Sequence, residues 1–403
     1  MVLACVCCAG FARQGPAVAT LSIFVEPMTR EFGWSRAVLS GAVSIGGLLA
    51  AVVAPLLGAA LDRHGARLVL CLAVLGTSIA TALLSLTQSL PMFYLLFCFA
   101  RMNWAGPFDL GIYGALNAWF VARRVFANAV ANLAQMAGLI ALPLIAQFAA
   151  VGHGWRAGWL AIGAAVLAIG LAPNALLLVG RPEELGLEPD RSRGAAARGA
   201  APIEEPTFTR QEALRTRAFW LLTLYTMLIY PVQAGFSLHQ AAHLIERGID
   251  PVTAATIVSS FSLMSTVATL VCAFLPRALP LRFPLAFSGV LLTLAALWMP
   301  GVATPRDGYL AAGLFGLGIG AMLTLLPLAW ANYFGSRSYG AIRGLALTGQ
   351  VVAQAAGPLL SGALRDATGS YAWSLHVFAA LGGLSVIAAL AAYPPRKSLV
   401  QRS

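Results

Sequence analysis

Three charged side chains stand inside stretches of sequence that are otherwise apolar, and their types indicate anion binding and proton transfer. They are Arg13, which is followed by Gln14, and the pair Arg101 and Asp109. A guanidinium group stays protonated and presents a planar fork of N–H donors that fits a carboxylate. We therefore predict that Arg13, Gln14 and Arg101 contact an anionic substrate. Asp109, the one carboxylate within these apolar stretches, is the candidate proton carrier.

Amide side chains extend this candidate site along two further segments. Three of them fall at i, i+4 and i+7, on one face of a helix, and two follow Arg343 at i+7 and i+11. These candidate substrate contacts are Asn128, Asn132, Gln135, Gln350 and Gln354. Amides also join helices to one another inside membranes, so each is equally compatible with a packing role.

The elements that position these residues are membrane-spanning helices. Of the 403 residues, 59% are hydrophobic and 10% are charged, a balance that excludes an ordinary soluble enzyme. A bilayer span needs about 20 mostly apolar residues, and breaks at charges, prolines and glycines delimit about twelve such spans. The first six are predicted at 3–25, 37–60, 68–88, 91–116, 127–149 and 159–179. The second six are predicted at 218–240, 253–275, 283–300, 309–332, 342–363 and 373–392.

One long polar stretch separates the two sets of spans. We therefore predict an all-α integral membrane protein with an N-terminal bundle of six helices over 1–180, a cytoplasmic linker over 181–217 and a C-terminal bundle over 218–403. Two Gly-Pro pairs, at Gly106-Pro107 and Gly357-Pro358, are predicted to break spans four and eleven and so to mark a site or a hinge.

The positive charge reports membrane topology and excludes a nucleic-acid partner. The net charge is +11, but most of the 26 basic residues, Arg343 among them, fall in loops or span ends on one side of the predicted bundle. Positively charged loops stay in the cytoplasm, so we expect a multi-pass protein of the inner (plasma) membrane, a monomer with both termini cytoplasmic.

The six cysteines lie in apolar stretches without metal-ligand spacing, and no cofactor or metal is expected.

The sequence contains an internal repeat. When it is shifted by 214 residues, the W-F-x-x-R segment at 119–123 aligns with Y-F-x-x-R at 333–337, and Trp159 aligns with Trp373. Two parallel six-helix repeats are typical of transporters that bind substrate between their halves.

The three intramembrane charges are missing from the second copy of the repeat. At the same offset their positions hold Met227, Phe315 and Leu323. A charge within a span costs about 2.5–3.5 kcal/mol on insertion scales, and a pure packing role would favour some retention in both copies. An asymmetric site built mainly by the first half is therefore favoured. The alternatives are an arginine at position 13 that extends toward the surface, and an internal ion pair between the charges at 101 and 109.

The loop after span two resembles a known family signature. It reads G-x-x-x-D-R-x-G-x-R, with the residues Gly58, Asp62, Arg63, Gly65 and Arg67. This is similar to the signature of the major facilitator superfamily, a resemblance that implies twelve helices in the major facilitator fold and a gating role for the loop as a latch on the inner face.

Further segments resemble the monocarboxylate and oxalate/formate branch of that superfamily. They are F-G-W-S-R at 32–36, R-P-E-E-L-G-L at 181–187, and the Gly-Pro and Gly-Ser-Tyr segments at 357–358 and 369–371. The segment from Arg101 to Gly106 is similar to the family's R-x-x-x-x-G element, a resemblance that implies a role for Arg101 in proton coupling together with Asp109.

The sequence thus predicts a secondary active transporter and no enzyme. It contains no G-x-x-x-x-G-K-[ST] loop for ATP and no hydrolase motif such as G-x-S-x-G. We expect proton-coupled symport of a small, monocarboxylate-like organic anion by alternating access within the lipid bilayer. The alternatives are efflux of apolar or cationic compounds, and a transport-inactive membrane receptor for a metabolite.

Overall fold

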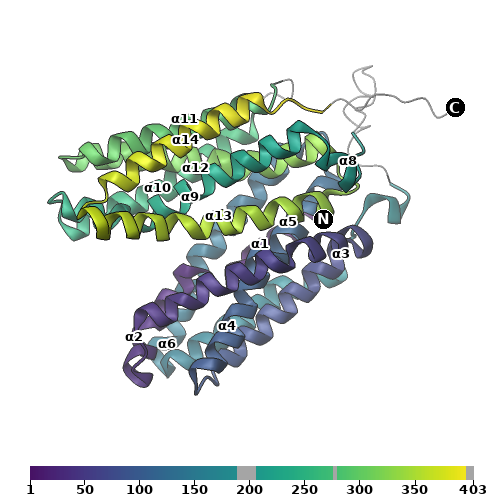
Figure 1. The fold of residues 1–403 in the computed structure, drawn as a ribbon. Helices are drawn as coiled ribbons and strands as arrows, with labels where there is room; N and C mark the ends of the chain where they lie inside the picture. The colour runs from purple at the N-terminus through teal and green to yellow at the C-terminus, as the bar shows by residue number, and fades with distance from the viewer. Residues whose placement is uncertain (188–205, 276–278, 396–403) are drawn as a thin grey trace. The chain divides into compact units, whose positions relative to one another are not determined.

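The computed structural model describes residues 1–187, 206–275 and 279–395. The regular elements of these residues are helices (Figure 1). The first part of the chain forms α1 (Val2–Arg13), α2 (Val18–Phe32), α3 (Arg36–Leu84), α4 (Leu90–Ala105), α5 (Pro107–Trp119), α6 (Arg124–Leu176) and η1 (Pro182–Leu185). The second part forms α8 (Arg210–Leu214), α9 (Arg217–Glu246), α10 (Pro251–Ala273), α11 (Arg282–Trp298), η3 (Met299–Gly301), α12 (Pro305–Phe334), α13 (Tyr339–Thr368) and α14 (Ala372–Ala391). Within the predicted linker, residues 188–205 lie outside the described residues.

Two of the long helices each contain two predicted spans. α3 turns at Gly65, whose φ is +78°, and α6 turns at Gly154, whose φ is +80°. Glycine adopts such positive φ values without the steric penalty of a Cβ atom, so each helix reverses there into the next span. Among the described residues, seven helices are long and apolar enough to cross a membrane, with α3 and α6 each counted once. Together with α1–α2, α4–α5 and the remaining helices, this confirms the predicted twelve-span, all-α architecture.

Broken helices occur in spans one and four. Span one is interrupted between Arg13 and Val18, a break that the sequence analysis did not predict, because Pro16 has no N–H to continue the helix. The Thr20 hydroxyl donates to the carbonyl of Gln14 at 3.0 Å and so satisfies part of the freed backbone. Span four breaks at Gly106 as predicted, with φ −108° and ψ −85°.

The predicted break in span eleven is wrong. α13 continues through Gly357 and Pro358 to Thr368. A Cβ atom at Gly357 would lie 2.2 Å from the carbonyl oxygen of Pro231 on α9. This glycine therefore permits close contact between α9 and α13, and that packing keeps the helix continuous although Pro358 removes one backbone hydrogen bond.

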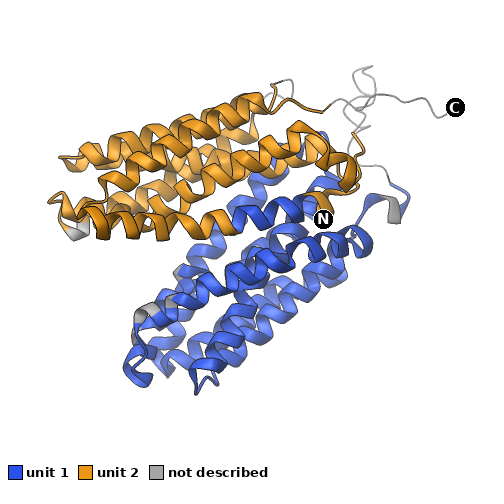
Figure 2. Cartoon of the chain, viewed as in Figure 1, with its two compact units in different colours: residues 1–203, 343–351 blue, residues 204–342, 352–403 orange. Residues whose placement is uncertain are grey.

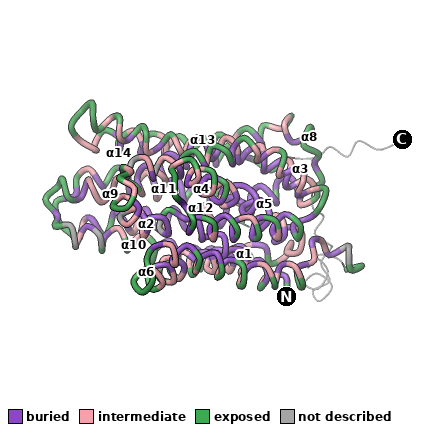
Figure 3. The backbone as a smooth tube through the Cα atoms, turned by 90° about the horizontal axis from the view of Figure 1, so that it is seen from below, coloured by how far each residue is buried: buried purple, intermediate pink, exposed green. Residues whose placement is uncertain are grey.

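The described helices form two compact units (Figure 2). Unit 1 consists of residues 1–203 and 343–351, and unit 2 consists of residues 204–342 and 352–403. α13 therefore contributes residues 343–351 to unit 1, and its residues before and after this segment belong to unit 2. Buried and exposed positions alternate along the helices (Figure 3), and exposed positions include large apolar residues such as Val52 and Phe148, as a lipid-facing surface requires.

Each unit has an aromatic core. In unit 1, Phe24 stacks on Trp159 with ring centroids 3.9 Å apart. In unit 2, Phe236 stacks on Phe315 at 4.0 Å. All four rings of these two stacks are almost fully buried, which fixes the helices that carry the polar residues described below.

Candidate functional site

The two helix breaks of unit 1 place opposite charges at helix ends. Arg13 is the last residue of α1, and Asp109 lies in the first turn of α5, directly after the break at Gly106. A cation at a helix C-terminus and an anion at an N-terminus are both stabilised by the helix dipole. Both residues are 7% exposed. The Gly15-Pro16 and Gly106-Pro107 sequences therefore do more than bend the two spans, because they create the helix ends at which these charges are tolerated.

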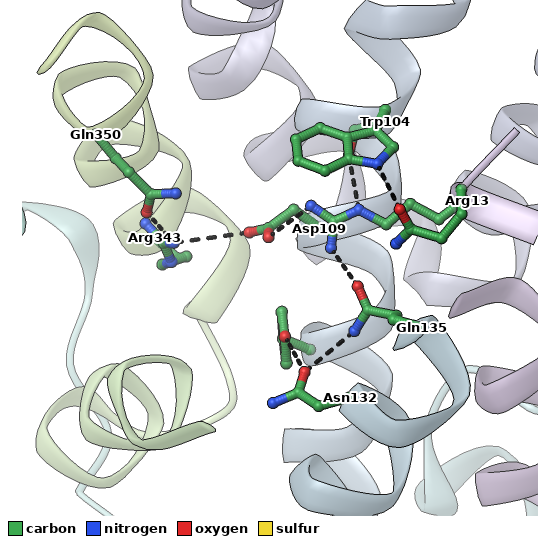
Figure 4. Close-up of polar contacts among 9 residues, drawn as sticks. Arg13, Trp104, Asp109, Asn132, Gln135, Arg343 and Gln350 are labelled. Atoms are coloured by element: carbon green, nitrogen blue, oxygen red, sulfur yellow. Dashed lines mark hydrogen bonds and ion pairs between the residues drawn. The ribbon is translucent and has the colours of Figure 1, made fainter. Parts of the chain in front are cut away.

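Arg13 uses all three guanidinium nitrogens within unit 1 (Figure 4). Nε donates to the carbonyl oxygen of Trp104 at 2.9 Å, and one terminal nitrogen donates to Oε1 of Gln135 at 2.9 Å. The other terminal nitrogen lies 3.2 Å from Oδ1 of Asp109 in a buried ion pair. The alternative that Arg13 extends toward the surface is therefore wrong, because its side chain is held inside by three separate acceptors.

Arg343 is the second partner of the same carboxylate. Its terminal nitrogen lies 3.6 Å from Oδ2 of Asp109 and donates to Oε1 of Gln350 at 2.5 Å (Figure 4). Arg343 was predicted to be one of the cytoplasmic loop charges, but in the structure it is 1% exposed within the turns of α13 that belong to unit 1. The sequence signal for this inward position was the spacing of seven residues between Arg343 and Gln350, which places both side chains on one face of the helix. The Nε and the other terminal nitrogen of Arg343 are buried without a hydrogen-bond partner.

Trp104 joins the site to Arg101. The guanidinium carbon of Arg101 lies 3.8 Å from the centroid of the indole ring, and that of Arg13 lies 4.6 Å from it. The indole Nε1 donates to Oε1 of Gln14 at 3.2 Å. Nε and one terminal nitrogen of Arg101 are buried and have no hydrogen-bond partner. Sequence reasoning missed Trp104, although its position three residues after an intramembrane arginine favours a cation–π contact.

The alternative ion pair between Arg101 and Asp109 does not form in the described structure. Asp109 instead lies between Arg13 and Arg343. The break at Gly106 changes the helix direction between positions 101 and 109, so their separation along one regular helix does not determine their distance.

The amide side chains of the predicted stripes differ in their hydrogen-bond partners. Oδ1 of Asn132 accepts from the Tyr113 hydroxyl at 2.8 Å and from Nε2 of Gln135 at 3.1 Å, which connects both amides to Arg13. Asn128 is fully buried, and neither of its side-chain polar atoms has a hydrogen-bond partner. Gln354 lies in unit 2, where its Nε2 donates to Oε1 of Gln233 at 3.2 Å, so it is not part of this cluster.

The gating motif surrounds the turn at Gly65. The backbone carbonyl of Asp62 accepts a hydrogen bond from Arg181, and Arg67 donates to the carbonyl of Ala175 near the end of α6. Arg63 is exposed. Arg67 thus joins the loop to α6 within unit 1, a contact that the motif by itself did not predict.

Gly58 of the predicted gating motif lies where α3 and α13 approach each other within unit 1. A Cβ atom at Gly344 of α13 would lie 3.3 Å from the Cα atom of Gly58 and 2.6 Å from the carbonyl oxygen of Ala54. Thr348, one turn farther along α13, donates its hydroxyl to the carbonyl of Ala51 at 2.7 Å. These contacts hold the first turns of α13 against α3 and so place Arg343 beside Asp109.

The cluster carries an excess of positive charge. Arg13 and Arg343 contact Asp109, and Arg101 lies over the Trp104 ring that Arg13 also contacts, so the four charges have a formal sum of two positive charges. Two of these arginines retain buried nitrogens without acceptors. Buried cations are stable when they are paired, so the arrangement favours an additional anion. Among the described residues, no group of three histidine, cysteine or acidic side chains has metal-binding geometry.

Comparison with known proteins identifies the family. Residues 2–358 match the Major Facilitator Superfamily. The chain belongs to that superfamily. It is a family of membrane transporters and not of enzymes, so this chain is a multi-pass membrane protein of a family that moves small molecules across the lipid bilayer.

Individual curated relatives share about 30% of their residues with this chain or slightly less. Mouse monocarboxylate transporter 11 is 30% identical over 79% of this chain and 71% of its own length. The membrane sensor protein UhpC of Escherichia coli is 28% identical over 59% of this chain. This chain spans a little over half the length of that sensor, 57%.

Solved structures share the fold at low sequence identity. The human organic anion transporter MFSD10 (TETRAN) superposes with a TM-score of 0.71 at 18% identity, covering 96% of this chain and 98% of that protein. A bacterial homologue of the iron transporter ferroportin, in an outward-facing state, superposes with a TM-score of 0.73 at 17% identity, covering 97% and 98%.

Proposed function

We propose that this protein is a secondary active transporter of a small, monocarboxylate-like organic anion. The observation that carries the proposal is the surplus of arginines over carboxylates, since Arg13 and Arg343 share the single acid Asp109 and Arg101 lies over the neighbouring Trp104 ring. A carboxylate bound to the unpartnered nitrogens of Arg101 and Arg343 neutralises part of the surplus charge and accepts hydrogen bonds that these nitrogens otherwise lack. The similarity to monocarboxylate transporter 11 supports this substrate class.

Asp109 supplies the proposed coupling to protons. A proton on Asp109 neutralises the carboxylate and leaves the neighbouring guanidinium groups of Arg13 and Arg343 without their counter-ion. The carboxylate of the substrate then replaces that counter-ion, so one proton and one anion are carried together without net charge. Electroneutral symport follows, with Arg101 as an additional contact of the substrate.

The proposed transport cycle uses the two halves of the repeat. The bundles at 1–180 and 218–403 rock about the substrate, and the linker at 181–217 connects them in the cytoplasm. Gly58, Asp62, Arg63, Gly65 and Arg67 act as the gating loop. We place the protein in the inner (plasma) membrane as a monomer with both termini cytoplasmic, in agreement with the bias of its positively charged loops.

Counterflow of labelled lactate in proteoliposomes tests the proposal. We expect exchange by the wild type and a loss of about 10-fold or more in Arg13→Ala and Arg101→Ala, because each removes a charged hydrogen-bond donor. Arg306→Ala, at an exposed position in the first turn of α12, is the matched control and keeps wild-type exchange. Wild-type exchange by both site variants contradicts the assignment.

A sensor function is the second candidate, and the similarity to UhpC favours it. A metabolite receptor of this fold binds its ligand but does not exchange it. A substrate-induced rise in melting temperature without counterflow supports the receptor, because binding to the folded state stabilises it whether or not transport follows. Drug export that survives both arginine substitutions instead supports the efflux alternative.

A further inference from the structure

Polar side chains continue from the charged cluster along the helix pair α5 and α6. On α5 they recur every four residues, and on α6 they recur at spacings of four, four and three, so each set occupies one helix face. The two sets are Asp109, Tyr113 and Asn117 on α5, and Arg124, Asn128, Asn132 and Gln135 on α6. Together they form a polar ladder that leads from Asp109 to the loop between the two helices.

Two hydrogen bonds fix the register of this ladder. The Tyr113 hydroxyl donates to Asn132 at 2.8 Å, and Arg124 donates to the backbone carbonyl of Asn117 at 2.7 Å. The two helices are therefore antiparallel. Asn117 lies four residues after Tyr113 and Asn128 lies four residues before Asn132, so these two asparagines occupy corresponding positions one helical turn closer to the loop.

These two asparagines are the unsatisfied part of the ladder. Both are 0% exposed. The nitrogen and the oxygen of each carboxamide lack a hydrogen-bond partner, in contrast to Asn132 one turn away. A buried carboxamide without partners is unfavourable, and a ligand that donates and accepts hydrogen bonds at this position removes the cost.

The charges along the ladder select the sign of that ligand. Arg124 is 3% exposed at the loop end, and the arginine cluster lies at the other end. Fixed positive charge in a polar path repels protons and metal cations and attracts anions. The ladder is therefore unsuited to proton release from Asp109, and its carboxamide N–H groups match the acceptor oxygens of a carboxylate.

We propose that Asn117, Asn128 and Arg124 form a second binding position for the carboxylate of the transported anion, between the central cluster and the α5–α6 loop. This site rests on the proposed transport of an organic anion. The carboxamide nitrogens of Asn117 and Asn128 donate to the carboxylate, the charge of Arg124 stabilises it, and accompanying water donates to the carboxamide oxygens. The anion thereby passes from the central arginines to the loop without losing its hydrogen bonds.

Leucine variants test this second site with labelled lactate as the probe. In Asn117→Leu and Asn128→Leu, we expect lactate counterflow per folded molecule to fall about 10-fold, as expected for loss of a hydrogen bond to a charged group. The dissociation constant for lactate, measured by thermal shift, stays at the wild-type value because the central arginines are intact. The melting temperature stays the same or rises, since an unsatisfied polar group has been removed.

Asn174→Leu is the matched control. Asn174 is equally buried on α6, but its nitrogen donates to the carbonyls of Cys5 and Gly170 at 3.1 and 2.8 Å. Its replacement lowers the melting temperature and leaves counterflow per folded molecule unchanged. If the Asn117 and Asn128 variants behave in this way, the two residues are packing groups and the proposal is overturned.

Isosteric variants separate an anion site from a position that binds water alone. Asn117→Asp places a second carboxylate in the ladder and lowers lactate flux if anions pass there, whereas a water position tolerates it and flux stays at the wild-type level, which overturns the proposal. A wild-type protein that exchanges no carboxylate refutes the proposed function and this site with it. Normal wild-type exchange with unchanged flux in every Asn117 and Asn128 variant refutes this site alone.

Discussion

Removal of the carboxylate at Asp109 tests whether it holds the central cluster together. Asp109 lies 3.2 Å from Arg13 and 3.6 Å from Arg343, with side-chain exposures of 10% for the acid and 8% and 2% for its partners. At an effective dielectric constant of about 20, each contact supplies about 5 kcal/mol of attraction. The cost of taking three charges out of water offsets most of this in the intact cluster.

The Asp109→Asn variant keeps the shape of the side chain and removes its charge. We expect a destabilisation of about 3–5 kcal/mol, because the neighbouring guanidinium groups stay buried without a counter-ion. For a unit of about 200 residues this corresponds to a fall in melting temperature of roughly 6–20 °C. Thermal unfolding of the purified protein in detergent measures it.

A second substitution distinguishes charge imbalance from damaged packing. Asp109→Asn combined with Arg343→Met removes one of the surplus positive charges, so we expect the double variant to regain about 1–3 kcal/mol relative to Asp109→Asn alone. A double variant that is less stable than the single one, or an Asp109→Asn protein that melts with the wild type, refutes the electrostatic reasoning.

Two further predictions concern unit 1 away from the cluster. Arg156 donates two hydrogen bonds to Glu31 and lowers the pKa of that carboxyl, so the pair stabilises the folded state above the unfolded-state pKa and the effect is lost as pH falls through the lowered value. Because the pair is exposed, melting curves of Glu31→Gln are expected to show a deficit of about 0.2–1 kcal/mol at neutral pH. The deficit shrinks as the pH falls below about 4.3, the ordinary pKa of a glutamate, and is lost once the pH is below the lowered pKa of Glu31 in the folded state. A deficit that persists in stronger acid contradicts this origin. Gly344→Ala is expected to lower stability by about 1–3 kcal/mol, because the new Cβ atom would collide with the carbonyl oxygen of Ala54. Gly47→Ala is the control and melts like the wild type, because its Cβ atom would lie 3.7 Å from Cγ1 of Val351, an ordinary contact distance.

Much of the architecture was predictable because the bilayer imposes a local rule. Every span must be apolar over about 20 residues and must satisfy its own backbone hydrogen bonds. Composition therefore indicated the twelve spans, and the Gly-Pro pair at 106–107 indicated a break. The identical dipeptide at 357–358 misled, because contact with Pro231 on α9 keeps that helix continuous, and such contact is absent from the local sequence.

The sequence predicted which charged residues belong to the candidate site, but it did not predict which of them form ion pairs. Scarcity of charge within spans was enough to select Arg13, Arg101 and Asp109, since each intramembrane charge is costly and needs a partner. Which partner each one takes depends on how helices far apart in sequence pack. Arg343, 234 positions from Asp109, was counted with the loop charges for this reason.

The sequence by itself determined the membrane class, the duplicated six-helix plan and the short set of buried charges, because hydrophobicity, repeat and charge are properties of local composition. The tertiary structure decided that Asp109 lies between Arg13 and Arg343, that Trp104 contacts two guanidinium groups, and that two asparagines of the ladder lack partners. Those facts depend on distances between helices, which follow from side-chain packing over the whole bundle and are encoded in no single segment.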